Sequence, residues 1–290
     1  MNDAPANGPS LVSGMQYHDA PAAIAFLECA FGFQPGLVVP GAEGSIVHAE
    51  LWLGRGAIML GSVKAADATY AVPRDLGDAN SGSCYVAVSD VEGLYERAMR
   101  AGARIVGGLE RTDYGSLDFS ARDPEGHLWH FGTFHPSALD PVPSEPEIFS
   151  GMRYERAGPA LEFLERAFGF ERQFVVPGEG DTIAHAQLRL GSSLLMIGSA
   201  RNDRYGMKTP RELGGKVTQS ICVAIGDPDR RFAASLEAGA TPLAAPYDTE
   251  YGSRSFTVRD PEGYVWHFGT YQAERPASAA GFHAGATAGG

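Results

Sequence analysis

The second half of the chain repeats the first, and this repeat constrains the fold more than any other feature. Three landmarks of the first half return in the second: RDPEG-x-x-WHFGT at Arg122–Thr133 and Arg259–Thr270, AFGF at Ala30–Phe33 and Ala167–Phe170, and a His-Ala pair at His48 and His185. The offset is the same 137 residues for His48 and for His130 (185 − 48 and 267 − 130). No net insertion separates these landmarks, so the 290 residues form a tandem duplication.

The repeat also predicts where the two copies begin and end. We expect one domain over residues 8–135 and a second over residues 149–272. Residues 136–148 between them are rich in proline, which is typical of a semi-rigid linker rather than a central strand. Residues 273–290 are mainly Ala, Gly and Ser, a composition that buries little apolar surface, and we expect this tail to be disordered.

Each copy shows two rounds of one strand, one helix and three strands. In the first round, Leu11–Tyr17 is a predicted strand, and Ile24, Leu27 and Phe31 share one face of a predicted helix that Gly32 ends. Its three strands are expected near Leu37–Val39, Ile46–Leu53 and Ala57–Leu60. The second round runs through Ser83–Val88, a helix at Val91–Ala101, and strands near Arg104–Val106, Leu117–Ala121 and His127–Gly132. Each copy is therefore two βαβββ units.

This order of elements carries motifs that are similar to one family. HAEL-x-LG from His48, DYGS from Asp113 and RDPEG-x-x-W-x-FGT from Arg122 resemble the PhnB-like branch of the glyoxalase/bleomycin-resistance/extradiol-dioxygenase (vicinal oxygen chelate, VOC) superfamily. The resemblance covers both copies. It implies an α+β fold of tandem VOC domains, in which two βαβββ units form a cupped mixed sheet. Helices would cover the convex face, and the concave face would hold a ligand.

Strand alternation predicts which side chains face the cup. In Ile46–Leu53, the apolar set Val47, Ala49, Leu51 and Leu53 is expected under the helices, so His48, Glu50 and Trp52 point into the cup. Treating the other strands in the same way gives one predicted cup per copy: His48, Glu50, Trp52, Met59, Tyr85 and His130 in the first, and His185, Gln187, Arg189, Met196, Cys222 and His267 in the second. Trp129 and Trp266 are expected in the core.

Two further motifs have a structural and a functional interpretation. Tyr114 of DYGS and Tyr251 of EYGS are expected at the cup rims, either as turn residues or as groups laid over the ligand. The turns Asp123–Gly126 and Asp260–Gly263, both DPEG, are expected to be structural. Proline presets the backbone of such a turn, and glycine accepts the positive φ.

The resemblance implies four metal positions per cup, and most of them lack a ligand here. Carried over residue by residue, they are Val12, Met59, Ser83 and His130 in copy one, and Phe149, Met196, Ser220 and His267 in copy two. Val, Phe and Met do not bind a borderline divalent ion, and exchange of half-sites between the copies would still offer at most two histidines. We predict no cofactor. One non-standard iron set, His48, Glu50 and His130, stays open.

Two classes of function follow. The first is metal-independent binding of a small organic molecule, such as drug or natural-product sequestration. The second is a VOC-type enzyme, a lyase/isomerase or a dioxygenase, that uses the non-standard set or acid–base catalysis by His130 or His267. Differences such as Glu50 against Gln187 also allow the two cups to bind different ligands.

Composition excludes several partners. A net charge of −12 disfavours nucleic acids and anionic membrane surfaces, and no apolar run is long enough to span a bilayer. Three cysteines without CxxC spacing do not form a disulfide framework. We expect a cytoplasmic protein, and a monomer whose two domains are arranged as a pseudo-dimer.

Overall fold

The computed structural model describes residues 10–64, 67–136 and 144–277, which contain sixteen strands and four α-helices. The first unit comprises β1 (Leu11–Tyr17), α1 (Ala20–Phe31), β2 (Gln34–Pro40), β3 (Ile46–Leu53) and β4 (Gly56–Ser62). The second comprises β5 (Gly82–Ala87), α2 (Val91–Arg100), β6 (Arg104–Arg111), β7 (Leu117–Arg122) and β8 (Leu128–Gly132). Most of the predicted linker and the tail beyond residue 277 lie outside the described residues.

The second copy repeats this order. Its third unit comprises β9 (Glu147–Tyr154), α3 (Ala157–Phe163) with a π-turn at Leu164–Phe168, β10 (Glu171–Pro177), β11 (Ile183–Leu190) and β12 (Ser193–Ser199). Its fourth comprises β13 (Gln219–Ala224), α4 (Pro228–Glu237), β14 (Thr241–Asp248), β15 (Arg254–Arg259) and β16 (Val265–Gly269). Short 3₁₀ turns lie at Ala42–Gly44 and Pro73–Leu76. The predicted order of four βαβββ units is confirmed. No helix in the described part of the chain is long and apolar enough to cross a membrane.

The helix ends follow the local chemistry that the sequence indicated. The Asp19 carboxylate accepts a hydrogen bond from the backbone N–H of Ala22 at 3.0 Å and caps α1 at its N-terminus. Gly32 ends α1 with φ of 84°, a left-handed conformation that a side chain would strain. Gly169 ends the corresponding helical segment of the second copy in the same way, with φ of 78°.

The two sheets are shared between the copies. Sheet 1 has the strand order β14-β15-β16-β13-β1-β4-β3-β2, and sheet 2 has the order β10-β11-β12-β9-β5-β8-β7-β6. The joins are antiparallel: β1 pairs with β13, and β5 pairs with β9. Each cupped sheet therefore combines one unit of copy one with one unit of copy two. The assignment of one cup to each copy was wrong, although the fold class is confirmed.

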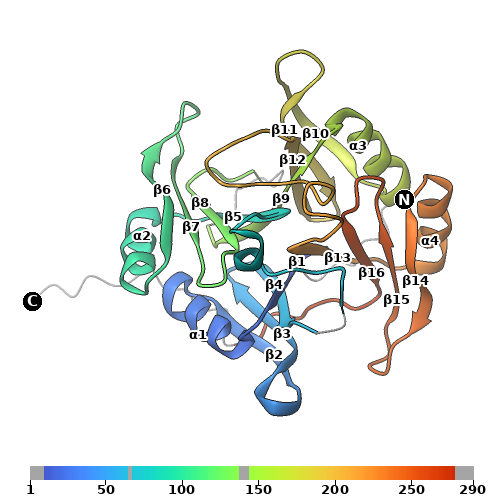
Figure 1. Ribbon diagram of the computed structural model, residues 1–290, viewed down its shortest axis with the longest axis horizontal. Helices are drawn as coiled ribbons and strands as arrows, with labels where there is room; N and C mark the ends of the chain where they lie inside the picture. Colours follow the sequence, from blue (N-terminus) through green and yellow to red (C-terminus); the bar gives the residue numbers. More distant parts are fainter. Residues whose placement is uncertain (1–9, 65–66, 137–143, 278–290) are drawn as a thin grey trace, which may run out of the picture.

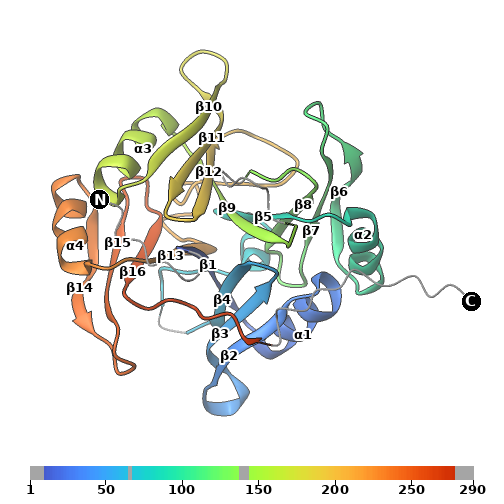
Figure 2. The ribbon, with the colours of Figure 1, turned by 180° about the vertical axis from the view of Figure 1, so that it is seen from behind.

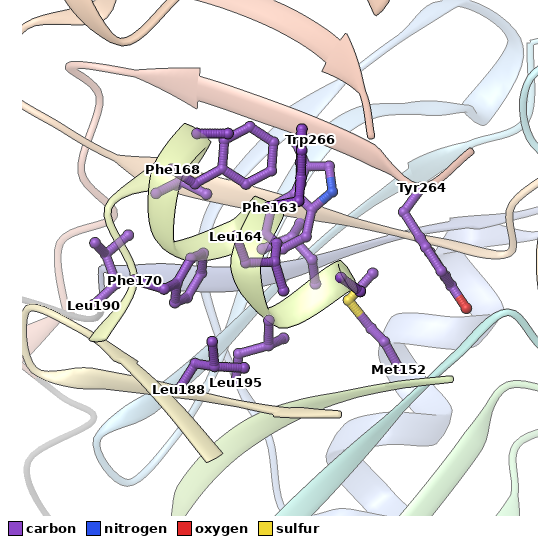
Figure 3. Packing of buried hydrophobic residues seen from close by; sticks show 14 of the residues in the cluster. Met152, Phe163, Leu164, Phe168, Phe170, Leu188, Leu190, Leu195, Tyr264 and Trp266 are labelled. Carbon is purple, nitrogen blue, oxygen red and sulfur yellow. The ribbon is translucent and has the colours of Figure 1, made fainter. Parts of the chain in front are cut away.

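The hydrophobic cores, in contrast, follow the copies. One cluster is built almost wholly from copy one, including Phe31 and Trp129, and the other almost wholly from copy two, including Phe168 and Trp266. The reason is that α1 packs against α2, and α4 packs against the π-turn after α3. The two helix pairs lie on opposite sides of the molecule (Figures 1 and 2). Figure 3 shows Phe163, Phe168 and Trp266 packed together in the second cluster.

Both predicted core tryptophans are buried and hydrogen bonded. Trp266 donates from Nε1 to the Asp260 carboxylate at 3.2 Å, and Tyr154 donates to the same carboxylate at 2.8 Å. Asp123 receives the equivalent bond from Trp129. The structure thus gives both DPEG turns a structural role. Their aspartates accept hydrogen bonds from buried aromatic side chains and so connect the last strand of each copy to its first strand.

One predicted core residue and one predicted disordered segment differ from expectation. Val47 is exposed and borders cup 1, whereas Ala49, Leu51 and Leu53 are buried in the core. Ala273 is buried, and Arg275 forms a 2.8 Å ion pair with Glu145. The chain is therefore packed for several residues past the point where we expected the tail to begin.

Candidate functional site

A pocket lies on the concave side of each sheet. Cup 1, on sheet 1, encloses about 870 Å³, and cup 2, on sheet 2, encloses about 570 Å³. His48 and Met59 of copy one meet Cys222 and His267 of copy two in cup 1. Because every cup contains strands of both copies, neither copy by itself forms a complete cup.

In cup 1, His267 is held by two protein partners. Its Nε2 lies 2.6 Å from the hydroxyl of Tyr70, and its Nδ1 lies 3.0 Å from the hydroxyl of Thr257. Burial lowers the pKa of His267 to about 4, so the imidazole is neutral at pH 7. A neutral imidazole has one donor and one acceptor, and both are used here.

His48 and Glu50 lie on the cup side of β3, with 3.6 Å between His48 Nε2 and Glu50 Oε1. Glu50 is buried, and Tyr271 donates a hydrogen bond to its Oε1 at 2.5 Å. Burial and this carboxylate together raise the pKa of the Tyr271 hydroxyl. Tyr271 belongs to the segment that follows β16, so this segment closes one end of cup 1.

The same segment covers Trp52, so the indole does not line the pocket. Trp52 packs with Val12, Ala57 and Ala273 in a small apolar cluster and is almost fully buried. Trp52 packs behind residues that line cup 1 and does not line the pocket itself, contrary to our prediction. Alternation along β3 gave the correct side of the sheet, but it could not show that Ala273 returns to cover the indole.

In cup 2, His130 occupies the place that corresponds to His267. Its Nδ1 lies 2.7 Å from the Ser120 hydroxyl, and Tyr205 packs edge-on against its ring at 4.9 Å between centroids. Burial, followed by the nearby charge of Arg153, lowers the pKa of His130 to about 4. Within the described residues, His130 Nε2 has no hydrogen-bond partner. This nitrogen can therefore serve a ligand, whereas both nitrogens of His267 are already engaged.

The wall of cup 2 formed by β9, β11 and the segment after β12 carries two guanidinium groups. Arg153, Arg201, His185 and Gln187 all line the pocket. Burial lowers the pKa of His185, and the charges of Arg153 and Arg201 lower it further. His185 is held by Gln187, with 3.2 Å between their side-chain nitrogens.

Most of the predicted ligand-binding residues line a cup, but the structure groups them differently from our prediction. Cup 1 is lined by His48, Met59, Cys222, Tyr251 and His267, and cup 2 by Tyr85, Tyr114, His130, His185, Gln187 and Met196. Glu50 borders a shallower hollow beside cup 1. Arg189 lines neither cup, because it turns toward Glu171 at the end of its strand and forms an ion pair there.

The two rim tyrosines lie where the motifs placed them. Tyr114 and Tyr251 are about two-thirds exposed and stand edge-on to Phe134 and Tyr271, respectively. Tyr114 also donates a hydrogen bond to Asp118 at 3.1 Å. Each ring therefore lies at a pocket mouth, in contact with the segment that follows the last strand of its copy.

Several residues of the cups, and partners of their histidines, were missed. Tyr70 and Tyr205 come from the segments between the paired units, for which the sequence gave no regular structure, and Tyr271 follows the last predicted strand. The position of Arg153 on the cup side could have been predicted from the sequence. It lies two and four residues beyond Gly151 and Phe149, and alternation places all three on the cup side of β9.

The residues present do not fit the divalent metal that the fold family implies. Recombining the four family positions as the sheets require gives Val12, Met59, Ser220 and His267 in cup 1, and Phe149, Met196, Ser83 and His130 in cup 2. At these four positions each cup thus offers one imidazole among apolar and hydroxyl side chains. The non-standard set fails for another reason: His48 and Glu50 are on sheet 1, but His130 is on sheet 2. No group of three His, Cys, Asp or Glu side chains suited to a metal occurs in the described ranges.

Comparison with known proteins agrees with this architecture. The chain is 32% identical to the uncharacterized protein Mb0911c of Mycobacterium bovis over 127 residues, which cover 43% of this chain and 83% of that protein. It has the same identity over 127 residues to the uncharacterized protein Rv0887c of Mycobacterium tuberculosis, of which 74% is covered.

Among solved structures, glyoxalase I from Zea mays shares the fold, with a TM-score of 0.68 and 15% sequence identity, and the match covers 90% of this chain and 92% of the maize chain. The family model "Glyoxalase/Bleomycin resistance protein/Dioxygenase superfamily" matches residues 12–131 and 151–268. The chain therefore belongs to the glyoxalase/bleomycin resistance protein/dioxygenase superfamily.

Proposed function

We propose that this protein binds small organic molecules in its two cups without a metal ion. The observation that carries the proposal is the state of the family's metal positions, where each cup keeps a single imidazole and the one in cup 1 is hydrogen bonded through both nitrogens. Both cups have the volume of ordinary ligand pockets, and aromatic and methionine side chains supply much of their walls. Exposed apolar side chains at the edges, Leu37, Val47 and Phe174, extend these walls outward.

Metal content and ligand binding test the proposal together. Protein without a histidine tag is to be incubated with Ni²⁺, Zn²⁺, Fe²⁺ or Mn²⁺, passed over a desalting column and analysed by elemental mass spectrometry. We expect less than about a tenth of an equivalent per chain, since one neutral imidazole cannot retain a divalent ion. Binding of aromatic compounds, followed by calorimetry, is expected to be the same before and after EDTA treatment. Near-stoichiometric metal that is lost in His267→Ala or His130→Ala would contradict the proposal.

The alternative is an enzyme of the glyoxalase or dioxygenase type. One observation favours it in cup 2: the Nε2 of His130 is without a protein partner among the described residues, so it can form a hydrogen bond with the reacting group of a bound molecule. Turnover separates the two functions. Compounds that bind are to be incubated with the protein and analysed by mass spectrometry, with His130→Gln as the control. Conversion that stops in His130→Gln establishes the enzyme, whereas recovery of unchanged compounds supports the binding protein.

The shared sheets also favour a monomer. The two antiparallel joins that would otherwise need a second chain are made within this one, between β1 and β13 and between β5 and β9. We propose that the protein is monomeric in solution. Light scattering coupled to size exclusion is expected to give the mass of one chain, and twice that mass would contradict this proposal.

A further inference from the structure

The two cups carry opposite charge although they are built from repeats of the same sequence. Two guanidinium groups, Arg153 and Arg201, and one carboxylate, Asp203, line cup 2. The charged side chains that line cup 1 are Asp248 and Glu250, and no lysine or arginine lines this pocket within the described ranges. The difference is built into equivalent positions, because Arg153 corresponds to Gln16 of the first copy (153 − 137).

Arg153 is placed in cup 2 by the backbone around it. It lies on the cup side of β9, and its register partner on the neighbouring strand β12 is Gly198. A side chain at Gly198 would collide with Nη1 of Arg153, so the glycine leaves the space through which the guanidinium reaches the pocket. The position is therefore built by two strands and is not a feature of a surface loop.

The guanidinium of Arg153 has no direct partner among the described residues, and only the more distant charge of Asp203 partly compensates it. Burial lowers the pKa of its guanidinium, and the charge of Arg201 lowers it further. No ion pair or hydrogen bond of this guanidinium is found among the described residues. The carboxylate of Asp203 lies nearer to Arg201, with 3.8 Å between Asp203 Oδ2 and Arg201 Nε. His130 and His185 are neutral neighbours, so they add donors or acceptors but no negative charge.

Arg153 is half-buried, and a partly desolvated cation without a direct partner destabilises a fold, so its retention points to a ligand that pairs with it. A carboxylate accepts two parallel hydrogen bonds from a guanidinium, and such a charge-assisted pair is about twice as strong as a neutral hydrogen bond. Much of the remaining pocket lining is apolar or aromatic, including Phe174, Met196 and Tyr205. A matching ligand therefore has an apolar or aromatic body that ends in an anionic group.

We propose that cup 2 is a site for an organic carboxylate, bound through Arg153, and that cup 1 does not accept such an anion. This inference rests on the proposed function, because it names the ligand class for one of the two cups. Among its described lining residues, cup 1 offers a carboxylate no guanidinium or ammonium group, and Glu250 adds negative charge, whereas Asp248 is paired with Arg254 at 3.0 Å. The two cups of one chain thus select different ligands.

Two probes with one aromatic body and different charge test the inference. Indole-3-acetate and its neutral amide, indole-3-acetamide, are to be titrated into the full-length protein by isothermal calorimetry at pH 7 and low salt. We expect one carboxylate site per chain, with a Kd about tenfold or more below that of the amide in cup 2, since a charge-assisted pair is worth at least this much. Added salt is expected to weaken the acetate more than the amide.

Three variants locate the effect. Arg153→Gln introduces the residue that the first copy has at the equivalent position, Gln16, so it suits the fold. It is expected to abolish the preference for the acetate while the amide still binds. Arg153→Lys is expected to keep part of the preference. Arg189→Gln is the matched control, because it removes a positive charge from the same sheet at a place outside the pocket. It is expected to leave both affinities unchanged.

The outcomes separate this inference from the proposed function. A preference that survives Arg153→Gln, or equal binding of the two probes to the unaltered protein, overturns the carboxylate site but leaves small-molecule binding intact. Failure of both probes to bind, together with no binding across a wider set of aromatic compounds, overturns both. Thermal unfolding without ligand gives a second check: Arg153→Gln is expected to melt at the same temperature or higher, and a marked fall would show that Arg153 serves the fold and not a ligand.

Discussion

The two cup histidines lead to a sharp prediction about acid stability. In the folded protein, burial holds the pKa of both His130 and His267 at about 4, whereas an unfolded histidine titrates near 6.5. As the pH falls from 7 to 5, the unfolded chain takes up two protons that the folded chain refuses. The free energy of unfolding therefore decreases over this window, and the loss is complete only below about pH 4.

The size of this effect follows from the two pKa values. Between pH 7 and pH 5, linkage gives about 2 kcal/mol for each histidine, or roughly 4 kcal/mol for both, as an upper limit because each ring borders a pocket that water can enter. The sites lie in different cups, so their contributions are expected to add. Asp260 opposes them: burial raises its pKa to about 6, so its folded form takes up a proton first, and acidification over the same window stabilises the fold by about 1 kcal/mol.

Comparison of variants separates the effect of the two histidines on stability from the opposing effect of Asp260. Urea unfolding is to be followed by the fluorescence of the three buried tryptophans at pH 7, 6 and 5, for the unaltered protein, His130→Gln, His267→Gln and the double variant. Each variant changes stability at pH 7 through its lost hydrogen bonds, but only the change with pH is diagnostic. We expect the double variant to lose up to about 4 kcal/mol less than the unaltered protein between pH 7 and pH 5. Equal pH dependence in all four proteins would refute the assignment of the histidines as buried and neutral.

Two further predictions concern the shared sheets and the closing segment. A chain that ends at Pro136 keeps its own core, but β1 keeps only β4 and β5 keeps only β8 as a partner, so each strand has one unpaired edge. We expect this chain to form a homodimer by light scattering, and a stable monomer would contradict the role of the two joins. Tyr271→Phe removes the hydroxyl that donates a hydrogen bond to Glu50. Because a buried carboxylate then loses its donor, thermal or urea unfolding is expected to show a loss of about 1–3 kcal/mol in the free energy of unfolding. An unchanged stability would mean that water replaces the tyrosine hydroxyl.

The sequence predicted the elements and the local architecture well, because these depend on short-range rules. Gly32 ends the first helix, where the pattern placed the stop, and Asp123 and Asp260 form the structural turns that the DPEG motif indicated. Alternation gave the right face for His48, Met59, His130 and Met196. Each of these features is encoded by residues close together in the chain, where backbone sterics and side-chain periodicity act directly.

The composition of each cup could not be read from the sequence. Whether β1 joins β13 or another unit is decided by contacts between residues about two hundred positions apart, and both arrangements satisfy the same pattern of apolar and polar residues. This is why His48 and His130 were grouped together although they lie on different sheets, and why Tyr70, which bonds His267, was missed.

The charged wall of cup 2 shows the same division between what the sequence determined and what the tertiary structure decided. The sequence by itself determined that Arg153 replaces Gln16 in the second copy and that alternation directs both toward a concave face. Only the tertiary structure decided that no carboxylate reaches the guanidinium of Arg153 among the described residues, and that Asp203 turns toward Arg201. Pairing of a charged group depends on distances between segments far apart in the chain, whereas its direction depends on the strand that carries it.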